Sequence, residues 1–108
     1  MNDLETLDAL LDMTKEAEEL ASDIEKPERL RLSIAEIRLK AKEEHNRLRR
    51  DRLPIETPYQ LCMIGILEEC DFGRVTWQNV MGIGARLRRI HEEIDRRTGE
   101  IKANRLIM

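Results

Sequence analysis

Apolar residues recur at alternating spacings of three and four along most of this 108-residue chain. Side chains return to one face of an α-helix at this period. Phe, Tyr and Trp occur once each, and the chain holds only five Gly and three Pro. This composition favours long helices, and the length favours one domain. We therefore predict a single all-α domain over residues 1–108.

Start and stop signals divide the pattern into four segments. Pro27 suits the first turn of a second helix, Thr57 and Pro58 repeat this signal, and Thr76 can cap a fourth helix. The predicted helices cover about residues 3–24, 27–52, 58–71 and 76–98, and residues 99–108 form a tail. Gly99 can end the fourth helix, and the alternative is that the apolar pattern continues to Ile101. The first two helices are each on the order of 35 Å long, so we expect them to form a hairpin.

The apolar faces predict how these helices pack. The main stripe of the second helix consists of Leu30, Ile34, Ile37, Ala41 and Leu48, and Leu32, Ala35 and Leu39 widen it. The third segment is apolar on nearly all sides, which is typical of a central helix. The predicted fold is a small four-helix bundle built on a long N-terminal helical hairpin, with a central apolar helix and an amphipathic fourth helix.

The fourth helix carries a heptad-like apolar face that reaches beyond the expected end of the third helix. Its members are Leu87, Ile90, Ile94 and Ile101. Because monomers rarely leave large apolar patches exposed, we predict a homodimer formed through these residues. The alternative is that a different protein covers this surface.

Gly82 and Gly84 lie inside the fourth segment, where each costs about 1 kcal/mol relative to Ala. We expect a close helix crossing there, against Gly65. A kink or a later helix start is the alternative. A phosphate-binding loop is disfavoured because no strand precedes the glycines and no Lys-Ser/Thr pair follows them.

Charge is segregated along the chain. Residues 1–28 hold ten acids and two bases, whereas residues 29–56 hold five acids and nine bases. The acids of the first helix form a stripe: Glu5, Asp8, Asp12, Glu16, Glu19 and Asp23. Such a stripe can be an ordinary solvated face, partly neutralised by Arg across the hairpin, or a surface that binds a basic partner by imitating phosphates.

A basic row faces one side of the second helix. It consists of Arg31, Arg38, Lys42, Arg49 and Arg52. Bases at this spacing can follow nucleic-acid phosphates. The acidic net charge of −3 and the near absence of aromatic residues weaken that interpretation.

Motifs for catalysis or metal binding are incomplete. The segment from His91 to Asp95 resembles a helical zinc site, but Asp95 replaces the second His. The pairs Glu16/Glu19 and Glu92/Asp95 resemble the magnesium ligands of helical nucleotide pyrophosphatases, although they lie far apart in sequence. We expect no cofactor, no metal and no enzymatic activity.

The sequence therefore predicts a non-enzymatic helical module that binds, inhibits or regulates a larger protein or complex. A small phage- or mobile-element-type inhibitor fits this description. The alternative is a dimeric nucleic-acid-binding protein that uses the basic row. The start of the chain is acidic and unlike a signal peptide, and no apolar stretch approaches the length of a membrane span. We therefore expect a cytoplasmic location.

Overall fold

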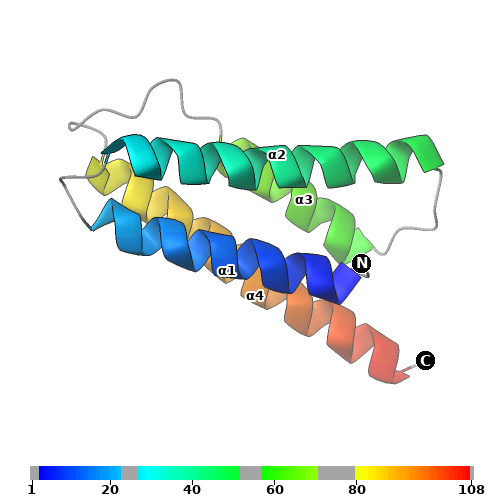
Figure 1. Cartoon of the computed structure of the whole chain (residues 1–108). Helices are drawn as coiled ribbons and strands as arrows, with labels where there is room; N and C mark the ends of the chain where they lie inside the picture. Colours follow the sequence, from blue (N-terminus) through cyan, green and yellow to red (C-terminus); the bar gives the residue numbers. More distant parts are fainter. Residues whose placement is uncertain (1–2, 23–26, 52–56, 71–79, 108) are drawn as a thin grey trace.

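The computed structural model describes residues 3–22, 27–51, 57–70 and 80–107. These residues form four helices: α1 (Asp3–Ala21), α2 (Pro27–Asp51), α3 (Thr57–Glu69) and α4 (Val80–Ile107). Helices that follow each other in the chain run in opposite directions (Figure 1). No strand occurs in these segments. The predicted all-α four-helix bundle is therefore confirmed.

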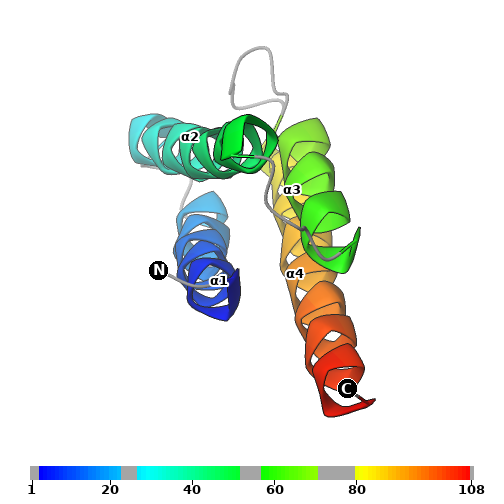
Figure 2. The same cartoon turned by 90° about the vertical axis from the view of Figure 1, so that its right-hand side faces the viewer.

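Each helix packs against two others. α1 contacts α2 and α4, and α3 contacts the same two helices, so the four form a closed ring. Seen nearly end-on in Figure 2, α1 and α2 form one side of the bundle and α3 and α4 the other. The expectation that α3 is central is wrong, because α3 occupies one corner and leaves Leu61 42% exposed.

Local chemistry explains several helix ends. α1 begins with Asp3 and Glu5 in its first turn, where the helix dipole favours negative charge. Ser22 lies just beyond the end of α1, and its hydroxyl donates a 2.7 Å hydrogen bond to the carbonyl oxygen of Glu19. α2 starts at Pro27, as predicted. The predicted N-cap Thr76 lies outside the described residues.

The C-terminal tail differs from the expectation. α4 continues through Gly99 to Ile107 instead of ending near residue 98. Ile101 is fully buried, and Arg105 forms a 3.4 Å ion pair with Asp3 of α1. Burial of a large side chain contributes about 1.5–3 kcal/mol, which outweighs the cost of about 1 kcal/mol for one helical glycine.

The core runs along the axis of the ring and contains residues from all four helices. Its α2 members are the predicted Leu30, Ile34, Ile37, Ala41 and Leu48. Leu32 and Leu39 were expected to widen this buried face, but they are 62% and 56% exposed. They lie on the opposite side of α2, which no described helix covers.

The predicted crossing at Gly82 and Gly84 is also wrong. A Cβ atom placed on either glycine meets nothing within 4 Å in the described part of the chain. Gly65 instead faces the side chain of Glu93, with 3.6 Å between an added Cβ and the Cγ of Glu93. The two α4 glycines therefore serve no close packing there.

Candidate interaction surfaces

The acidic stripe of α1 points directly away from the core. Its members Glu5, Asp8, Asp12, Glu16 and Glu19 are all exposed, and Asp23 lies outside the described residues. The carboxylates of Asp8, Asp12, Glu16 and Glu19 make no hydrogen bond or ion pair with another described residue. Partial neutralisation by arginines across the hairpin is therefore not seen for these four. We call them the acidic row.

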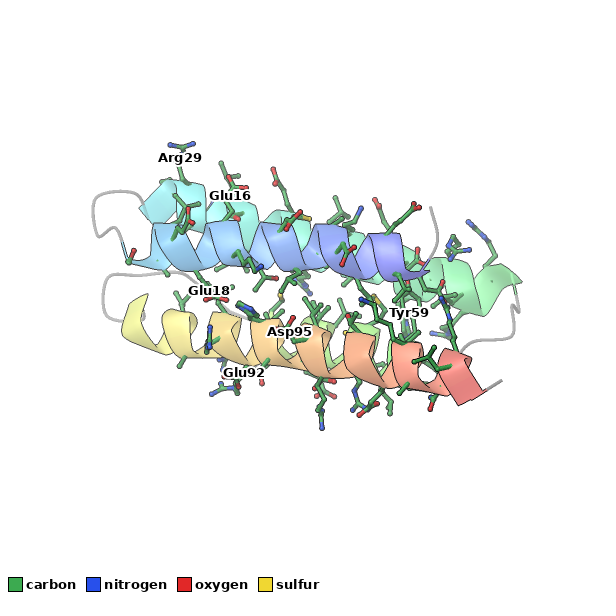
Figure 3. The ribbon with its side chains drawn as sticks, turned by 90° about the horizontal axis from the view of Figure 1, so that it is seen from below. Glu16, Glu18, Arg29, Tyr59, Glu92 and Asp95 are labelled. Atoms are coloured by element: carbon green, nitrogen blue, oxygen red, sulfur yellow. The ribbon has the colours of Figure 1, made fainter. Side chains whose placement is uncertain are left out.

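Acids that lie between helices behave differently. Glu18 accepts a 2.7 Å hydrogen bond from His91 of α4, and Glu69 of α3 pairs with Arg89 at 3.1 Å. Figure 3 shows Glu18 in the seam between α1 and α4, while Glu16 points away from it. In the described structure, the ion-pair partners of Arg88, Arg89 and Arg97 lie within α4 or at its contacts with α1 and α3, and none of them belongs to the outer face of α1.

The basic row occupies the flank of α2 nearest α3. Its members Arg31, Arg38, Lys42 and Arg49 are exposed and make no hydrogen bond or ion pair within the described segments, and Arg52 lies outside them. Arg38 and Lys42 border a groove of about 460 Å³ whose α3 side includes Ile64 and Leu67. Four of the five residues of the predicted basic row therefore lie exposed along α2.

The residues expected to form a homodimer are not on the surface. Leu87, Ile90 and Ile101 are fully buried and Ile94 is 1% exposed. The expectation compared this face only with the reach of the third helix, whereas α1 also packs against α4. Because buried side chains cannot contact a second copy, the assignment of self-association to these four residues is corrected.

The incomplete metal-like motifs of the sequence do not come together in the described structure. His91 lies between two carboxylates, with Nδ1 2.7 Å from Glu18 Oε1 and Nε2 3.2 Å from Asp95 Oδ2. The two ring nitrogens point in different directions, so these carboxylates do not share a ligand position with one nitrogen. Glu16 and Glu92 point to opposite sides of the α1–α4 pair in Figure 3. The described residues hold no group of three metal-ligating side chains.

A buried polar contact joins α2 to α3. The Tyr59 hydroxyl, on a fully buried side chain, donates a 2.6 Å hydrogen bond to Glu44 Oε1. Arg47 donates to both oxygens of the same carboxylate. The Arg47 hydrogen bonds lower the pKa of Glu44 despite its partial burial, and burial followed by the Glu44 contact raises the pKa of Tyr59.

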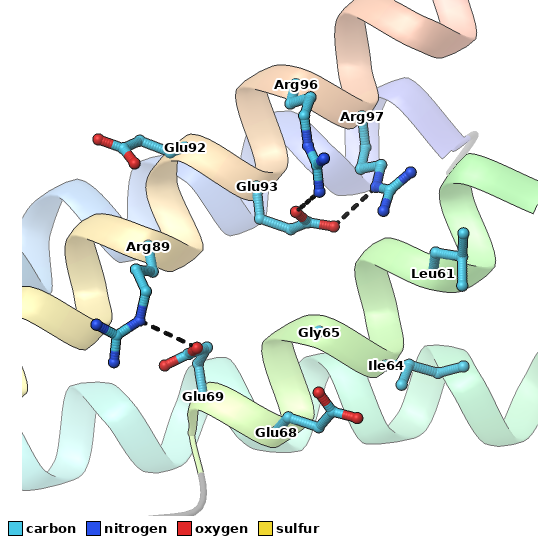
Figure 4. Close-up of a pocket in the computed structure, with 10 residues that line it drawn as sticks. All are labelled: Leu61, Ile64, Gly65, Glu68, Glu69, Arg89, Glu92, Glu93, Arg96 and Arg97. Atoms are coloured by element: carbon cyan, nitrogen blue, oxygen red, sulfur yellow. Dashed lines mark hydrogen bonds and ion pairs between the residues drawn. The ribbon is translucent and has the colours of Figure 1, made fainter.

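A groove of about 600 Å³ separates the outer edges of α3 and α4. Figure 4 shows Glu93 at its side, with Arg96 and Arg97 directed at its carboxylate. Burial opposes ionisation of Glu93, but hydrogen bonds from Arg97 and Arg96 outweigh it and lower its pKa. Arg89 also has a carboxylate partner, so the three arginines that line this groove are all paired with acids.

The two cysteines belong to the core. Cys62 is fully buried and Cys70 is 2% exposed, both as free thiols. Burial raises the pKa of each thiol to about 12, which suppresses the reactive thiolate. Neither residue has the exposure or lowered pKa of a nucleophile.

Comparison of the chain with known protein families, with characterised proteins and with solved structures finds no match. None of the described helices is both long enough and apolar enough to cross a bilayer.

Sequence reasoning located both charged rows but missed two features. The first is the contact between Glu44 and Tyr59. Glu44 stands at a core-facing position of α2, between Ala41 and Leu48, which was a usable signal for a buried partner. The second is the exposure of Leu32 and Leu39, which share a seven-residue spacing.

Proposed function

We propose that this chain is a non-enzymatic protein–protein interaction module that binds a basic surface of a larger protein through the acidic row. One observation carries the proposal: four exposed carboxylates on one helix face lack a partner in the described structure. Partner binding, inhibition or regulation is the class of function that such a face serves.

The spacing of the acidic row supports a linear basic target. Successive carboxylates in it lie three or four residues apart, which corresponds to about 4.5–6 Å along the helix axis. One strand of duplex DNA carries a phosphate about every 3.4 Å along its axis. The row therefore presents an extended anionic array, somewhat sparser than a nucleic-acid strand, to a protein that binds phosphates.

The energetic role of the row is mainly selection of the partner. Complementary charge raises the association rate and rejects acidic partners, while exposed ion pairs each contribute little affinity. Apolar contacts must supply the rest of the binding free energy. We infer that the row orients the partner on the outer face of α1.

The test compares three immobilised proteins in capture from a host lysate. These are the native chain, the row variant Asp12→Lys/Glu16→Lys, and the control Glu28→Lys/Glu68→Lys, which makes the same charge change at exposed acids elsewhere. The captured protein is then purified and titrated. We expect a basic protein whose affinity falls about tenfold or more with the row variant alone. Equal affinity for all three proteins contradicts the proposal.

The basic row supports a second candidate, binding of nucleic acid. Its four described bases are also exposed and without a described partner. A titration of labelled duplex DNA at several salt concentrations separates the two functions. Binding through about four phosphate contacts gives a slope near −4 in log affinity against log salt. Loss of that binding in Arg38→Glu, with retention in the row variant, favours the second candidate.

A further inference from the structure

The outer ridge of α2 carries exposed leucines at a seven-residue interval. Leu32 is 62% and Leu39 is 56% exposed, and the exposed Ala35 lies between them. α2 lies along one outer edge of the bundle, and the ridge faces away from the core. Apolar residues that repeat every seven positions on one helix face are typical of contact with another helix.

Charges of opposite sign flank this ridge. Arg31 and Arg38 each precede a leucine by one residue, and Glu36 and Glu43 each follow one by four. In a heptad lettered a to g, the two leucines occupy position a, the two arginines occupy position g, and the two glutamates occupy position e. These four charged side chains are exposed and have no ion pair or hydrogen bond in the described structure.

The two flanks lie over different neighbours. Arg38 borders the groove toward Ile64 and Leu67 of α3, whereas Glu43 borders a hollow toward Thr6 of α1. A helix laid along the two leucines therefore meets Arg31 and Arg38 on the α3 side and Glu36 and Glu43 on the α1 side, where Lys40 and Arg50 also border the hollow. The four charges next to the leucines sum to zero, so they fit a partner helix that carries both signs of charge.

Symmetry decides which arrangement of two identical ridges satisfies the charges. In a parallel two-fold pair, the g positions of one helix face the e positions of the other. Each g residue contacts the e residue of the partner helix whose number is higher by five. Arg31 is five residues before Glu36, and Arg38 is five residues before Glu43. An antiparallel two-fold pair instead places Arg against Arg and Glu against Glu.

We propose that α2 pairs in parallel with α2 of a second copy of this chain. Leu32 and Leu39 then pack against their counterparts, and Arg38 pairs with Glu43 of the partner subunit. Arg31 likewise pairs with Glu36 of the partner subunit. This proposal is independent of the acidic row, which lies on α1 and shares no residue with the ridge.

Polar residues that follow the two leucines limit the strength of this dimer and fix its register. Asn46 occupies the a position after Leu39, where a single Asn specifies register and oligomer state at a cost in stability. Lys42 occupies a d position, which ends the apolar seam after two leucines. The dimer is therefore weak and concentration-dependent, with its orientation set by charge.

Sedimentation equilibrium over a series reaching millimolar concentration tests the pairing. The native mass rises from 12.7 kDa toward twice that value. Arg38→Glu and Glu43→Arg each weaken association about tenfold, because each places like charges at both symmetric contacts. Mixing the two variants restores a heterodimer, since every contact then joins Glu to Arg. Glu68→Arg, the same change on α3, leaves the native behaviour unchanged.

Cross-linking tests the orientation. Leu32→Cys and Leu39→Cys each replace an exposed side chain, so circular dichroism should show the native helix content. Each variant forms a disulfide with its own counterpart in the parallel dimer, and the buried Cys62 and Cys70 react slowly. A mass of 12.7 kDa throughout, or no recovery on mixing the charge variants, overturns the proposal. So does a disulfide that forms only when Leu32→Cys is mixed with Leu39→Cys and not within either variant alone.

Discussion

Removal of the Tyr59 hydroxyl tests the polar contact that Tyr59 of α3 makes with Glu44 of α2. Tyr59→Phe keeps the buried ring and deletes the 2.6 Å hydrogen bond to Glu44. A hydrogen bond to a charged group contributes about 1.5–3 kcal/mol. Glu44 retains two hydrogen bonds from Arg47 and is 14% exposed, so water and Arg47 compensate in part. We expect a loss of about 1.5 kcal/mol, or roughly 6 °C in Tm.

Urea unfolding followed by circular dichroism measures this loss, provided that the transition is two-state. A double-mutant cycle with Glu44→Gln isolates the pair, for which we expect a coupling of about 1 kcal/mol. Glu68→Gln is the matched control, because Glu68 is an exposed acid of α3 without a described partner. An unchanged unfolding free energy in Tyr59→Phe, or an equal loss in the Glu44→Gln background, refutes the reasoning.

Three further predictions concern stability and reactivity. The pKa values of Glu44 and Glu93 are lowered in the folded chain, so their stabilisation is complete above the unfolded pKa near 4.3 and is lost as pH falls below it. Urea unfolding across a pH series should show a shallower acid slope after Glu44→Gln/Glu93→Gln; an identical slope contradicts this. Gly84→Ala should raise the unfolding free energy by about 1 kcal/mol, because an added Cβ meets nothing within 4 Å of the described chain, and calorimetry would expose any destabilisation. Cys62 and Cys70 should react with a thiol reagent at pH 8 far more slowly in the native protein than in urea, because burial raises both pKa values to about 12. Rapid native labelling contradicts their burial.

The spacing of apolar residues was sufficient to predict the four helices and most of the core. Ile34, Ile37 and Ala41 return to one side of α2 every three or four residues, and the structure buries them. Periodicity could not decide whether Leu32 and Leu39 face the core or the surface. An apolar residue fits either a widened core face or a second contact surface, and only the placement of α1 and α3 separates the two.

Charged residues at core-facing positions were the main obstacle to predicting packing. Arg97 interrupts the apolar stripe of α4, and its pairing with Glu93 and Glu100 depends on helix geometry rather than on apolar spacing. Glu44 similarly requires Tyr59 from another helix. The charged rows were predictable because exposure follows from their position opposite the apolar stripe. The absence of ion-pair partners for these rows was not predictable, because it depends on where the arginines of other helices point.

The seam between α1 and α4 has a consequence for the rate of folding. Its polar contacts join residues far apart in the chain: Glu18 and His91 are separated by 73 positions, and Asp3 and Arg105 by 102. The other three seams join helices that are consecutive in the chain. Closing a long loop costs more entropy than forming a helical hairpin, so the α1–α4 seam should form late, after the transition state. Interactions that form late slow unfolding and leave refolding nearly unchanged. The lifetime of the native bundle, rather than its rate of formation, therefore depends on this seam.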